Sequence, residues 1–365
     1  MNETTATPGN LEELRSLLRS ESLVLPVGNQ TKQPLASDDR AQLVSLRGMT
    51  GILEYEPSEF TFTALAGTTV LEVSETLQQR QQYLPFDPML VQAGATIGGA
   101  VGSGLSGPGR FRYGGLRDFL LGVKFLSGDG EVINSGGKVV KNAAGFDIPK
   151  LLVGSMGRLG VMVEMTFKVF PMPGRQQTLA VECGSMQDAM KRMAAAAASH
   201  WELDAVDYRP GANTLFLRLA GPDKVNQMVI RKIMERWGSD VTELADGDAF
   251  WRAVKELDWS DKTRAFAVKI PTHRRVVEAL ADWVGKRSHI DLHVSAAGAV
   301  AWLLCDTQSD LDDLDRILLK HEVAGLLVRG ESTRLGIGCW PRTEISVAVK
   351  HAMDPVSKFP HLFPT

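Results

Sequence analysis

Apolar residues in the first 172 positions alternate between helical and strand-like spacing. Leucines between residues 11 and 18 recur on one helix face after Asn10, a typical N-cap. Thr69 and Glu72 match a capping box that opens a second helix, expected to reach about residue 82. Short apolar runs predict the strands 23–25, 42–46, 51–55, 60–66, 117–127, 131–135 and 159–170, with a short helix at 147–153. Gly128-Asp129-Gly130 predicts a hairpin turn between two of these strands.

The pattern changes after Pro171 and Pro173, where a second region begins. Its periodicity predicts the order β-α-β-β-α-β twice, with a linking helix near 250–257 between the copies. The first copy comprises 177–183, 186–199, 205–209, 213–220, 222–237 and 239–244, and the second 264–270, 273–287, 289–295, 299–305, 309–321 and 323–329. Two such units side by side predict one antiparallel sheet with helices on one face. A last helix is expected from 342 to 353.

Composition and charge exclude several functional classes. The 365 residues suffice for two cores, and a net charge of −3 gives no basic footprint for nucleic acid. Three scattered cysteines provide neither a disulfide framework nor a zinc or iron–sulfur ligand set. No signal-peptide pattern or apolar run of about 20 residues is present. We therefore expect a cytoplasmic protein, with any membrane association made through partner subunits.

Nine glycines crowd the 22 positions from Gly94 to Gly115. Glycine costs backbone entropy, so such a run indicates sharp turns and main-chain N–H groups left accessible to an anion. Gly102, Gly104 and Gly107 also spell the G-x-G-x-x-G fingerprint of a Rossmann unit. That fingerprint needs a strand before it and a helix after it, whereas Thr96–Ala100 is a poor strand and Pro108 interrupts a helix. We therefore favour a phosphate-bearing cofactor bound outside a Rossmann fold.

Four segments resemble the FAD-binding oxidoreductases with a PCMH-type flavin domain, the vanillyl-alcohol oxidase family. They are similar in particular to the FAD-binding E subunits of bacterial glycolate oxidases. The segments are Pro26-Val27-Gly28-Asn29-Gln30-Thr31; Ala95–Gly99 leading to Arg112–Gly115; Lys138–Asp147 leading to Val153–Val161; and the tail Lys350-His351-Ala352-Met353-Asp354-Pro355. The first three span residues 20–172 in order and spacing, and Lys141–Asp147 points to the glycolate oxidase branch.

The resemblance implies an α+β fold with three parts. A PCMH-type FAD-binding domain is expected at 1–172 and a ferredoxin-like cap (duplicated βαββαβ) at 175–335. A C-terminal helical tail, 336–365, is expected to return to the FAD domain. The cofactor would be FAD, with its pyrophosphate held by main-chain amides of the loops 26–31 and 96–106. The implied FAD-binding residues are Pro26, Val27, Gly28, Asn29, Gln30, Thr31, Thr96, Ile97, Gly98, Gly99, Ser103, Gly104, Ser106, Arg112, Tyr113, Gly114, Gly154, Gly157, Gly160 and Val161.

Three departures from the family pattern qualify this expectation. Neither 26–31 nor 94–115 contains the histidine or cysteine that holds flavin covalently, so noncovalent FAD is predicted. Gly104 stands where related dehydrogenases often have asparagine. The stretch 293–300 lacks the second histidine and the acidic residue of the relatives' metal or substrate motif, which puts independent substrate oxidation in doubt. No metal is expected.

Candidate catalytic residues are few. His289 and His293 would share a strand face around Asp291, where surface or sheet packing is the favoured interpretation over a general base. Arg329 and Arg334 could grip a carboxylate, but solvated ion pairs are favoured. Arg112 is better placed to bind an anion, because it lies beside the flavin loop in the sequence, but a phosphate-side role and a surface role both stay open. Since none of these residues is singled out as a base, the sequence predicts no catalytic residue.

The leading hypothesis is a noncovalent FAD subunit of a glycolate oxidase complex that oxidises glycolate to glyoxylate. By resemblance, its partners would be a larger flavoprotein and an iron–sulfur subunit that takes the electrons. Two alternatives stay open: a stand-alone FAD dehydrogenase for another 2-hydroxy acid, and a flavin-binding assembly subunit without turnover of its own.

Overall fold

The computed structural model describes residues 5–32, 40–137, 146–332, 334–340 and 344–361. The chain forms two compact units: unit 1 comprises 1–106, 115–172 and 341–365, and unit 2 comprises 107–114 and 173–340. Residues 107–114 were expected in the first domain and group instead with the second. Residues 336–340 also belong to unit 2, because β18 (Gly336–Gly338) pairs with β17 (Ala324–Arg329).

Unit 1 is built on a five-stranded antiparallel sheet in the order β3-β4-β8-β6-β7. Its strands are β3 (Ile52–Glu56), β4 (Thr61–Leu65), β6 (Leu120–Leu126), β7 (Val132–Gly136) and β8 (Val161–Lys168). Alternate residues of β8 are buried, and the rings of Phe62 on β4 and Phe167 on β8 stack with centroids 5.5 Å apart. The predicted strands and the β6–β7 hairpin are confirmed.

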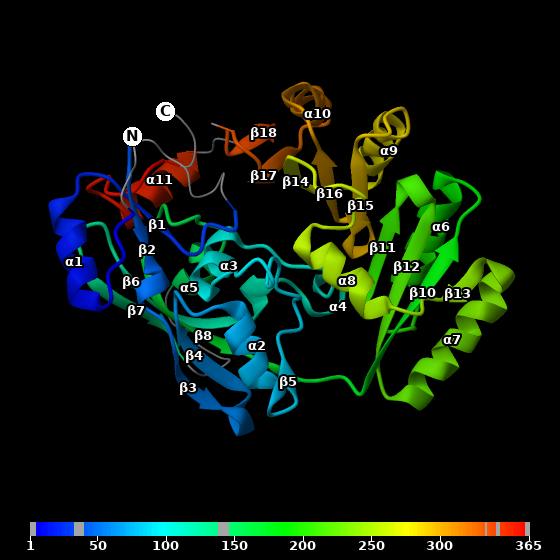
Figure 1. The fold of residues 1–365 in the computed structure, drawn as a ribbon, viewed down its shortest axis with the longest axis horizontal. Coiled ribbons are helices and arrows are strands. Elements are labelled where there is room, and N and C mark those ends of the chain that lie inside the picture. The colour runs from blue at the N-terminus through cyan, green and yellow to red at the C-terminus, as the bar shows by residue number, and fades with distance from the viewer. Residues whose placement is uncertain (1–4, 33–39, 138–145, 333, 341–343, 362–365) are drawn as a thin grey trace. The chain divides into compact units, whose positions relative to one another are not determined.

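Smaller elements surround this sheet (Figure 1). They are α1 (Leu11–Ser20), α2 (Val70–Gln78), α3 (Ile97–Ser103), α5 (Ile148–Leu152) and α11 (Glu344–Met353), the parallel pair β1 (Val24–Val27) and β2 (Gln42–Ser45), and the pair β5 (Gln82–Tyr83) and β9 (Phe170–Pro171). Asn10 caps α1 as predicted. Helix α2 ends four residues short of expectation, because Gln82 opens strand β5.

The C-terminal segment is fastened to unit 1 by a buried lysine. The Lys350 ammonium donates to the main-chain oxygens of Arg158 (2.8 Å) and Phe359 (2.9 Å) and to the carboxylate of Asp354. Asp354 is 1% exposed, and it also accepts from the main-chain N–H groups of Lys358 and Phe359. These contacts hold the tail against the turn that precedes β8.

Unit 2 contains one nine-stranded sheet in the order β13-β10-β12-β11-β15-β16-β14-β17-β18, and its described pairings are antiparallel. Each predicted βαββαβ copy supplies four strands to this sheet. The two copies join where Tyr208 of the first pairs with Val294 of the second. The first has β10 (Arg175–Glu182), α6 (Met186–Ala197), β11 (Ala205–Arg209), β12 (Thr214–Gly221), α7 (Asp223–Trp237) and β13 (Val241–Glu243). The second has β14 (Phe266–Pro271), α9 (Arg274–Val284), β15 (Asp291–Ser295), β16 (Val300–Cys305), α10 (Gln308–Lys320) and β17.

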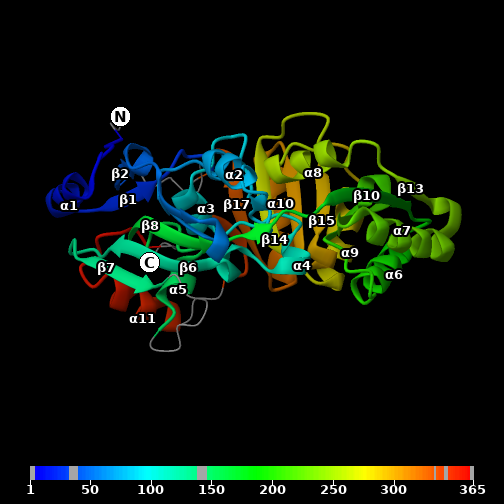
Figure 2. The ribbon, with the colours of Figure 1, turned by 90° about the horizontal axis from the view of Figure 1, so that it is seen from below.

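The helices of unit 2 lie on both faces of its sheet, which corrects the expectation of one covered face. Helices α6, α7, α9 and α10 share one large core with the strands. Helix α8 (Gly247–Glu256) packs through Trp251 and Val254 against Ala205 and Phe216, which belong to a separate core cluster. Figure 2 shows α8 across the strands from α6 and α9. We call this second side of the sheet the α8 face. The short helix α4 (Arg110–Tyr113) also belongs to unit 2.

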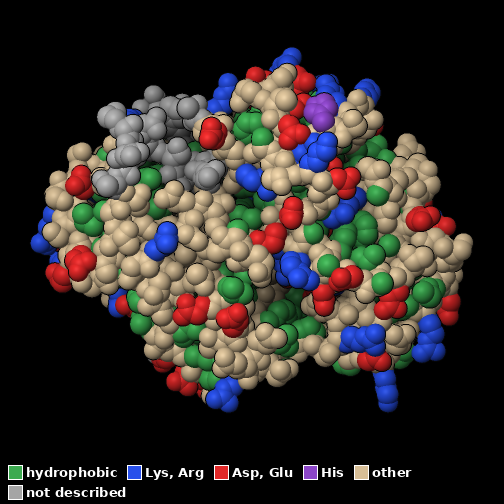
Figure 3. Space-filling model, viewed as in Figure 1, with side chains coloured by type: hydrophobic (Ala, Val, Ile, Leu, Met, Phe, Trp, Pro, Cys, Tyr) green, Lys and Arg blue, Asp and Glu red, His purple; other side chains and the backbone are tan. Residues whose placement is uncertain are grey.

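Charges of both signs are mixed over the face drawn in Figure 3, in keeping with the net charge of −3. Among the described residues, no helix is long and apolar enough to cross a membrane. The same part of the chain holds no cluster of three histidine, cysteine, aspartate or glutamate residues suited to a metal ion.

Candidate functional site

Unit 1 contains a groove where three separate segments of the chain meet. It is lined by loop 26–32, by helix α3 with Thr96 before it, and by the turn 156–160 that leads into β8. Leu46, Ala66 and Met162 contribute apolar surface. The groove holds about 680 Å³ of empty space, open solvent included.

Loop 28–31 offers unpaired main-chain donors. In the described chain, the N–H groups of Gly28, Asn29, Gln30 and Thr31 donate no hydrogen bond to protein atoms. Gln30 has φ 51°, in the left-handed region, and turns containing such a residue gather successive N–H groups around an anion. This loop therefore has the geometry of a phosphate cradle.

The opposite wall differs from the sequence expectation. Residues 97–103 form helix α3, with Thr96 as its N-cap and Gly104, at φ 62°, as its C-cap. The N–H groups of Ile97, Gly98 and Gly99 already donate to Thr68 O, Ala66 O and Thr96 Oγ1. This second segment therefore contributes close backbone approach rather than accessible amides.

Glycine is required where the three segments approach one another. A Cβ on Gly28 would lie 2.2 Å from Thr96 Oγ1, and one on Gly157, whose φ is 72°, would lie 2.7 Å from Pro26 Cγ. Gly98 is equally constrained, because its Cβ would meet Ala66 Cβ at 2.9 Å. The glycine-rich pattern therefore brings together walls that are far apart in sequence.

The polar groups of the groove suit an anion. Among its described lining residues, Lys32 carries the one charge, and it donates from Nζ to Thr31 Oγ1 at 3.0 Å. Beside the lining residue Met156, the hydroxyl of Ser155 is buried without a hydrogen bond to the described protein. Within the lining itself, a cation and uncovered amides fit the diphosphate part of a dinucleotide cofactor.

The structure brings most of the predicted cofactor residues together. Those that line the groove are Pro26, Val27, Gly28, Asn29, Gln30, Thr31, Thr96, Gly98, Gly99, Ser103, Gly157 and Gly160. Buried in unit 1 but outside the lining are Ile97, Ser106 and Val161, and Ser106 Oγ accepts from Leu116 N. Gly104 and Gly154 also lie outside it, and a Cβ on Gly104 would meet the Gly154 backbone at 3.2 Å.

The remaining predicted residues, Arg112, Tyr113 and Gly114, belong to unit 2. There Arg112 donates to both the main-chain oxygen and the carboxylate of Glu202, so its guanidinium is engaged within that unit. The segment 138–145, which carried part of the family resemblance, lies outside the described residues. Sequence reasoning missed Lys32, Leu46, Ala66, Gly102, Met156 and Met162 as lining residues. Lys32 directly follows the predicted loop, and its charge was the available signal.

A second polar cluster lies on the α8 face of unit 2. Asp207 on β11 binds His293 on β15, with 2.7 Å between Oδ2 and Nε2, and both side chains are fully buried. Its other oxygen accepts from Ser295 Oγ (2.9 Å) and Ala296 N (3.1 Å). Burial lowers the pKa of His293 below its usual value, although the hydrogen bond that His293 donates to Asp207 acts in the opposite direction. His293 was expected in surface or sheet packing; it is buried on β15, at the centre of a polar network with Asp207 and Arg209.

The other candidate side chains have structural partners. His289 is half-exposed, precedes β15 and pairs with Asp310. Arg334 is exposed beside Asp312, 3.4 Å away, as the solvated interpretation predicted. Arg329 Nη1 donates to Leu257 O, so it ties the end of β17 to the end of α8. None of these contacts indicates a catalytic role.

Comparison with known proteins agrees with the geometry of unit 1. Residues 3–136 match the FAD binding domain family, FAD_binding_4. Glycolate oxidase subunit GlcE of Escherichia coli (strain K12) is 31% identical over 285 residues, which cover 75% of this chain and 77% of that protein. Glycolate oxidase subunit GlcD of Bacillus subtilis and D-lactate dehydrogenase of Archaeoglobus fulgidus are each 29% identical, over 49% and 52% of this chain. These two matches span only 39% and 43% of the relatives' own lengths.

A solved structure shares the fold over nearly the whole chain. Alkyldihydroxyacetonephosphate synthase superposes with a TM-score of 0.69 over 96% of this chain and 74% of that one, at 16% identity. Together with the GlcE match, this confirms the predicted α+β fold class with a PCMH-type FAD-binding domain. The chain belongs to the PCMH-type FAD-binding oxidoreductases, in the family of the glycolate oxidase E subunits.

Proposed function

We propose that this protein is the noncovalent FAD-binding subunit of a glycolate oxidase complex, which oxidises glycolate to glyoxylate. The observation that carries the proposal is the groove of unit 1, where uncovered amides of residues 28–31 face a wall of glycines. Within the described lining residues there is no histidine or cysteine that could attach a flavin covalently.

Loop 28–31 and Lys32 would hold the diphosphate of FAD, and Gly98, Gly99 and Gly157 would admit its extended chain. Bound FAD supplies the acceptor for the hydride that leaves the carbon bearing the hydroxyl group. The protein's part is to fix the cofactor through main-chain donors that are already in place, because preorganised donors need no rearrangement on binding.

The relatives named as GlcE and GlcD support assembly with further subunits. As the family resemblance implies, we propose that electrons leave through a partner with iron–sulfur centres. This assembly is also the route by which the protein would come to a membrane.

Anaerobic mixing of the FAD-loaded chain with glycolate tests the reaction. If the flavin absorbance bleaches with the isolated chain, the chain itself oxidises glycolate, and bleaching with D-lactate alone favours a stand-alone dehydrogenase. If bleaching requires the co-purified partners, the chain acts within a complex. The proposal fails if neither the chain nor the complex is reduced by glycolate.

A further inference from the structure

The α8 face of unit 2 carries side chains that the cofactor groove does not use. Asp207 and Arg209 alternate on β11, and His293 stands on β15, the strand beside it. Trp259 follows α8, with its ring centroid 5.3 Å from that of His293. We refer to Asp207, Arg209, His293 and Trp259 as the Arg209 cluster.

The hydrogen bonds of the cluster fix the proton on His293. Arg209 Nε lies 3.3 Å from His293 Nδ1, and a guanidinium N–H can only donate. His293 Nδ1 therefore accepts, and Nε2 carries the proton that is donated to Asp207. This hydrogen-bond pattern holds the imidazole neutral and lets it bind one nitrogen of Arg209, and burial, which lowers the pKa of His293, acts in the same direction.

The rest of the Arg209 guanidinium is positioned but not saturated. It lies over the ring of Phe250 at 4.4 Å and over that of Phe216 at 5.6 Å. Within the described chain, its two terminal nitrogens have no hydrogen-bond or ion-pair partner. Burial lowers the pKa of Arg209 to about 10, so the site holds a cation at a cost in hydration. A guanidinium that is stacked and oriented in this way can donate from its two terminal nitrogens to the two oxygens of a carboxylate.

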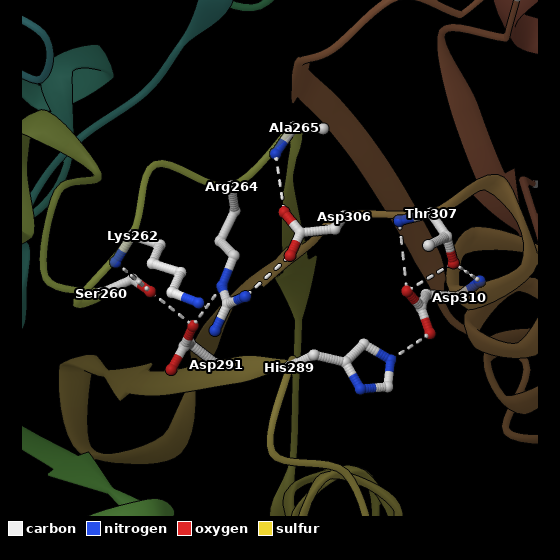
Figure 4. A network of polar contacts seen from close by, with 9 residues as sticks. All are labelled: Ser260, Lys262, Arg264, Ala265, His289, Asp291, Asp306, Thr307 and Asp310. Carbon is white, nitrogen blue, oxygen red and sulfur yellow. Dashed lines mark hydrogen bonds and ion pairs between the residues drawn. The ribbon is translucent and has the colours of Figure 1, made fainter.

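A second donor borders the same imidazole. Trp259 Nε1 is buried and has no hydrogen-bond acceptor among the described residues. Its neighbour Ser260 donates to Asp291 at 2.7 Å, and Arg264 bridges Asp291 and Asp306 at 2.8 and 2.7 Å. Figure 4 shows these contacts tying the segment after α8 to the ends of β15 and β16. Such anchoring holds an indole donor in place without giving it an acceptor.

We propose that Arg209 and Trp259 form a subsite for a small carboxylate anion. The inference rests on the proposed function only in identifying that anion as the carboxylate of the 2-hydroxy acid substrate. His293 and Asp207 are positioning residues, because they hold Arg209 through Nε and leave its terminal nitrogens for the ligand. An anion here supplies the acceptors that the guanidinium and the indole lack among the described residues.

Oxalate, an unreactive dicarboxylate, is the probe. Its affinity for the FAD-loaded full chain is measured by isothermal titration calorimetry for the wild type, R209M, R209K and W259F. We expect oxalate to bind the wild type about 30-fold more tightly than R209M, and R209K and W259F to lose about five- to tenfold. The matched control is R275M, which removes an exposed arginine of α9 and is expected to bind as the wild type does.

Thermal unfolding of each variant shows whether it is folded, and W259F keeps an aromatic ring beside His293 if R209M does not fold. No oxalate binding by the wild type, or equal affinity in the wild type, R209M and W259F, would overturn the subsite. Flavin that glycolate never reduces would overturn the proposed function instead. In that case a loss of oxalate affinity in R209M would still support the subsite.

Discussion

The groove of unit 1 and the Arg209 cluster of unit 2 are built by opposite means. The groove relies on main-chain amides and on glycines whose Cβ atoms would collide, with Lys32 as its one charge among the described lining residues. The cluster relies on polar side chains of the neighbouring strands β11 and β15 and on an aromatic side chain of the segment after α8. A main-chain site binds any ligand of matching shape and charge, whereas a side-chain site selects its ligand by hydrogen-bond geometry. We infer that the first holds a constant cofactor and the second distinguishes substrates.

The largest effect is expected from the buried Lys350, which is an exception to this contrast because it is a charged side chain that anchors part of unit 1. Lys350→Met removes the donor to Arg158 O and Phe359 O and leaves the buried Asp354 carboxylate without its cation. We expect unit 1 to lose about 3–5 kcal/mol of unfolding free energy. Urea unfolding followed by far-UV circular dichroism measures the loss. Lys191→Met, at an exposed position on α6, is the control, and equal losses in both variants would refute the anchoring role.

Asp207→Asn tests whether the cluster depends on hydrogen-bond polarity. An asparagine has one acceptor oxygen where the aspartate has two. Its NH2 group faces either the Nε2–H of His293, where a change of tautomer would place Nδ1–H against Arg209 Nε–H, or, after an amide flip, the N–H of Ala296. We expect a loss of about 2–4 kcal/mol in unit 2, because each of these arrangements leaves a buried donor facing a donor. All seven tryptophans lie between residues 201 and 340, so tryptophan fluorescence follows the unfolding of this unit.

Asp223→Asn is the matched control for this variant. Asp223 pairs with Arg175, and both side chains are 54% exposed. Its replacement is expected to change the unfolding free energy by less than about 1 kcal/mol, as for other surface ion pairs. A comparable loss in the two variants would mean that the Asp207–His293 pair contributes nothing beyond a surface contact.

Gly28→Ala tests the main-chain side of the comparison. The added methyl group would displace Thr96, whose hydroxyl caps α3 through Gly99 N. We expect FAD affinity to fall by about 30-fold, equivalent to about 2 kcal/mol, because the two walls must move apart. Fluorescence quenching of added FAD measures the affinity. Gly184→Ala, where nothing lies within 4 Å of the new Cβ, should bind FAD normally, and unchanged affinity in Gly28→Ala would contradict the close approach.

The smallest effect concerns pH. Burial lowers the pKa of His293 in the folded protein, so the unfolded chain binds more protons below its own pKa, near 6.5. The stability of unit 2 should therefore fall as the pH drops below that value, and it should gain nothing from this group above it. The loss between about pH 7.5 and about pH 5 is at most about 2 kcal/mol. Tryptophan-monitored urea unfolding of the wild type and His293→Gln measures it, and identical pH slopes would contradict the assignment.

The sequence predicts the groove better than the cluster for a physical reason. Glycines and turn residues mark a main-chain site locally, so loop 26–31, Gly98 and Gly157 could be named from short segments. Helix α3 was missed because three of its seven residues are glycines, which local propensity disfavours in helices. There, tertiary hydrogen bonds to Ala66 O and Thr68 O override propensity.

The cluster could not be assembled from sequence. Asp207 and His293 are 86 positions apart, and their contact depends on how the two βαββαβ units join along β11 and β15. The double pattern predicts the strands but not this edge pairing, so His293 looked like an isolated histidine. Helix α8 was placed in the chain correctly, but its apolar face gave no sign of which side of the sheet it covers.

The most direct test of the account is a titration of the purified, flavin-free chain with FAD, followed by acid precipitation and recovery of the yellow colour. The account predicts one FAD per chain, bound in the groove of unit 1 and released to the supernatant when the protein precipitates. A chain that takes up no FAD, or flavin that stays with the precipitate, would contradict it.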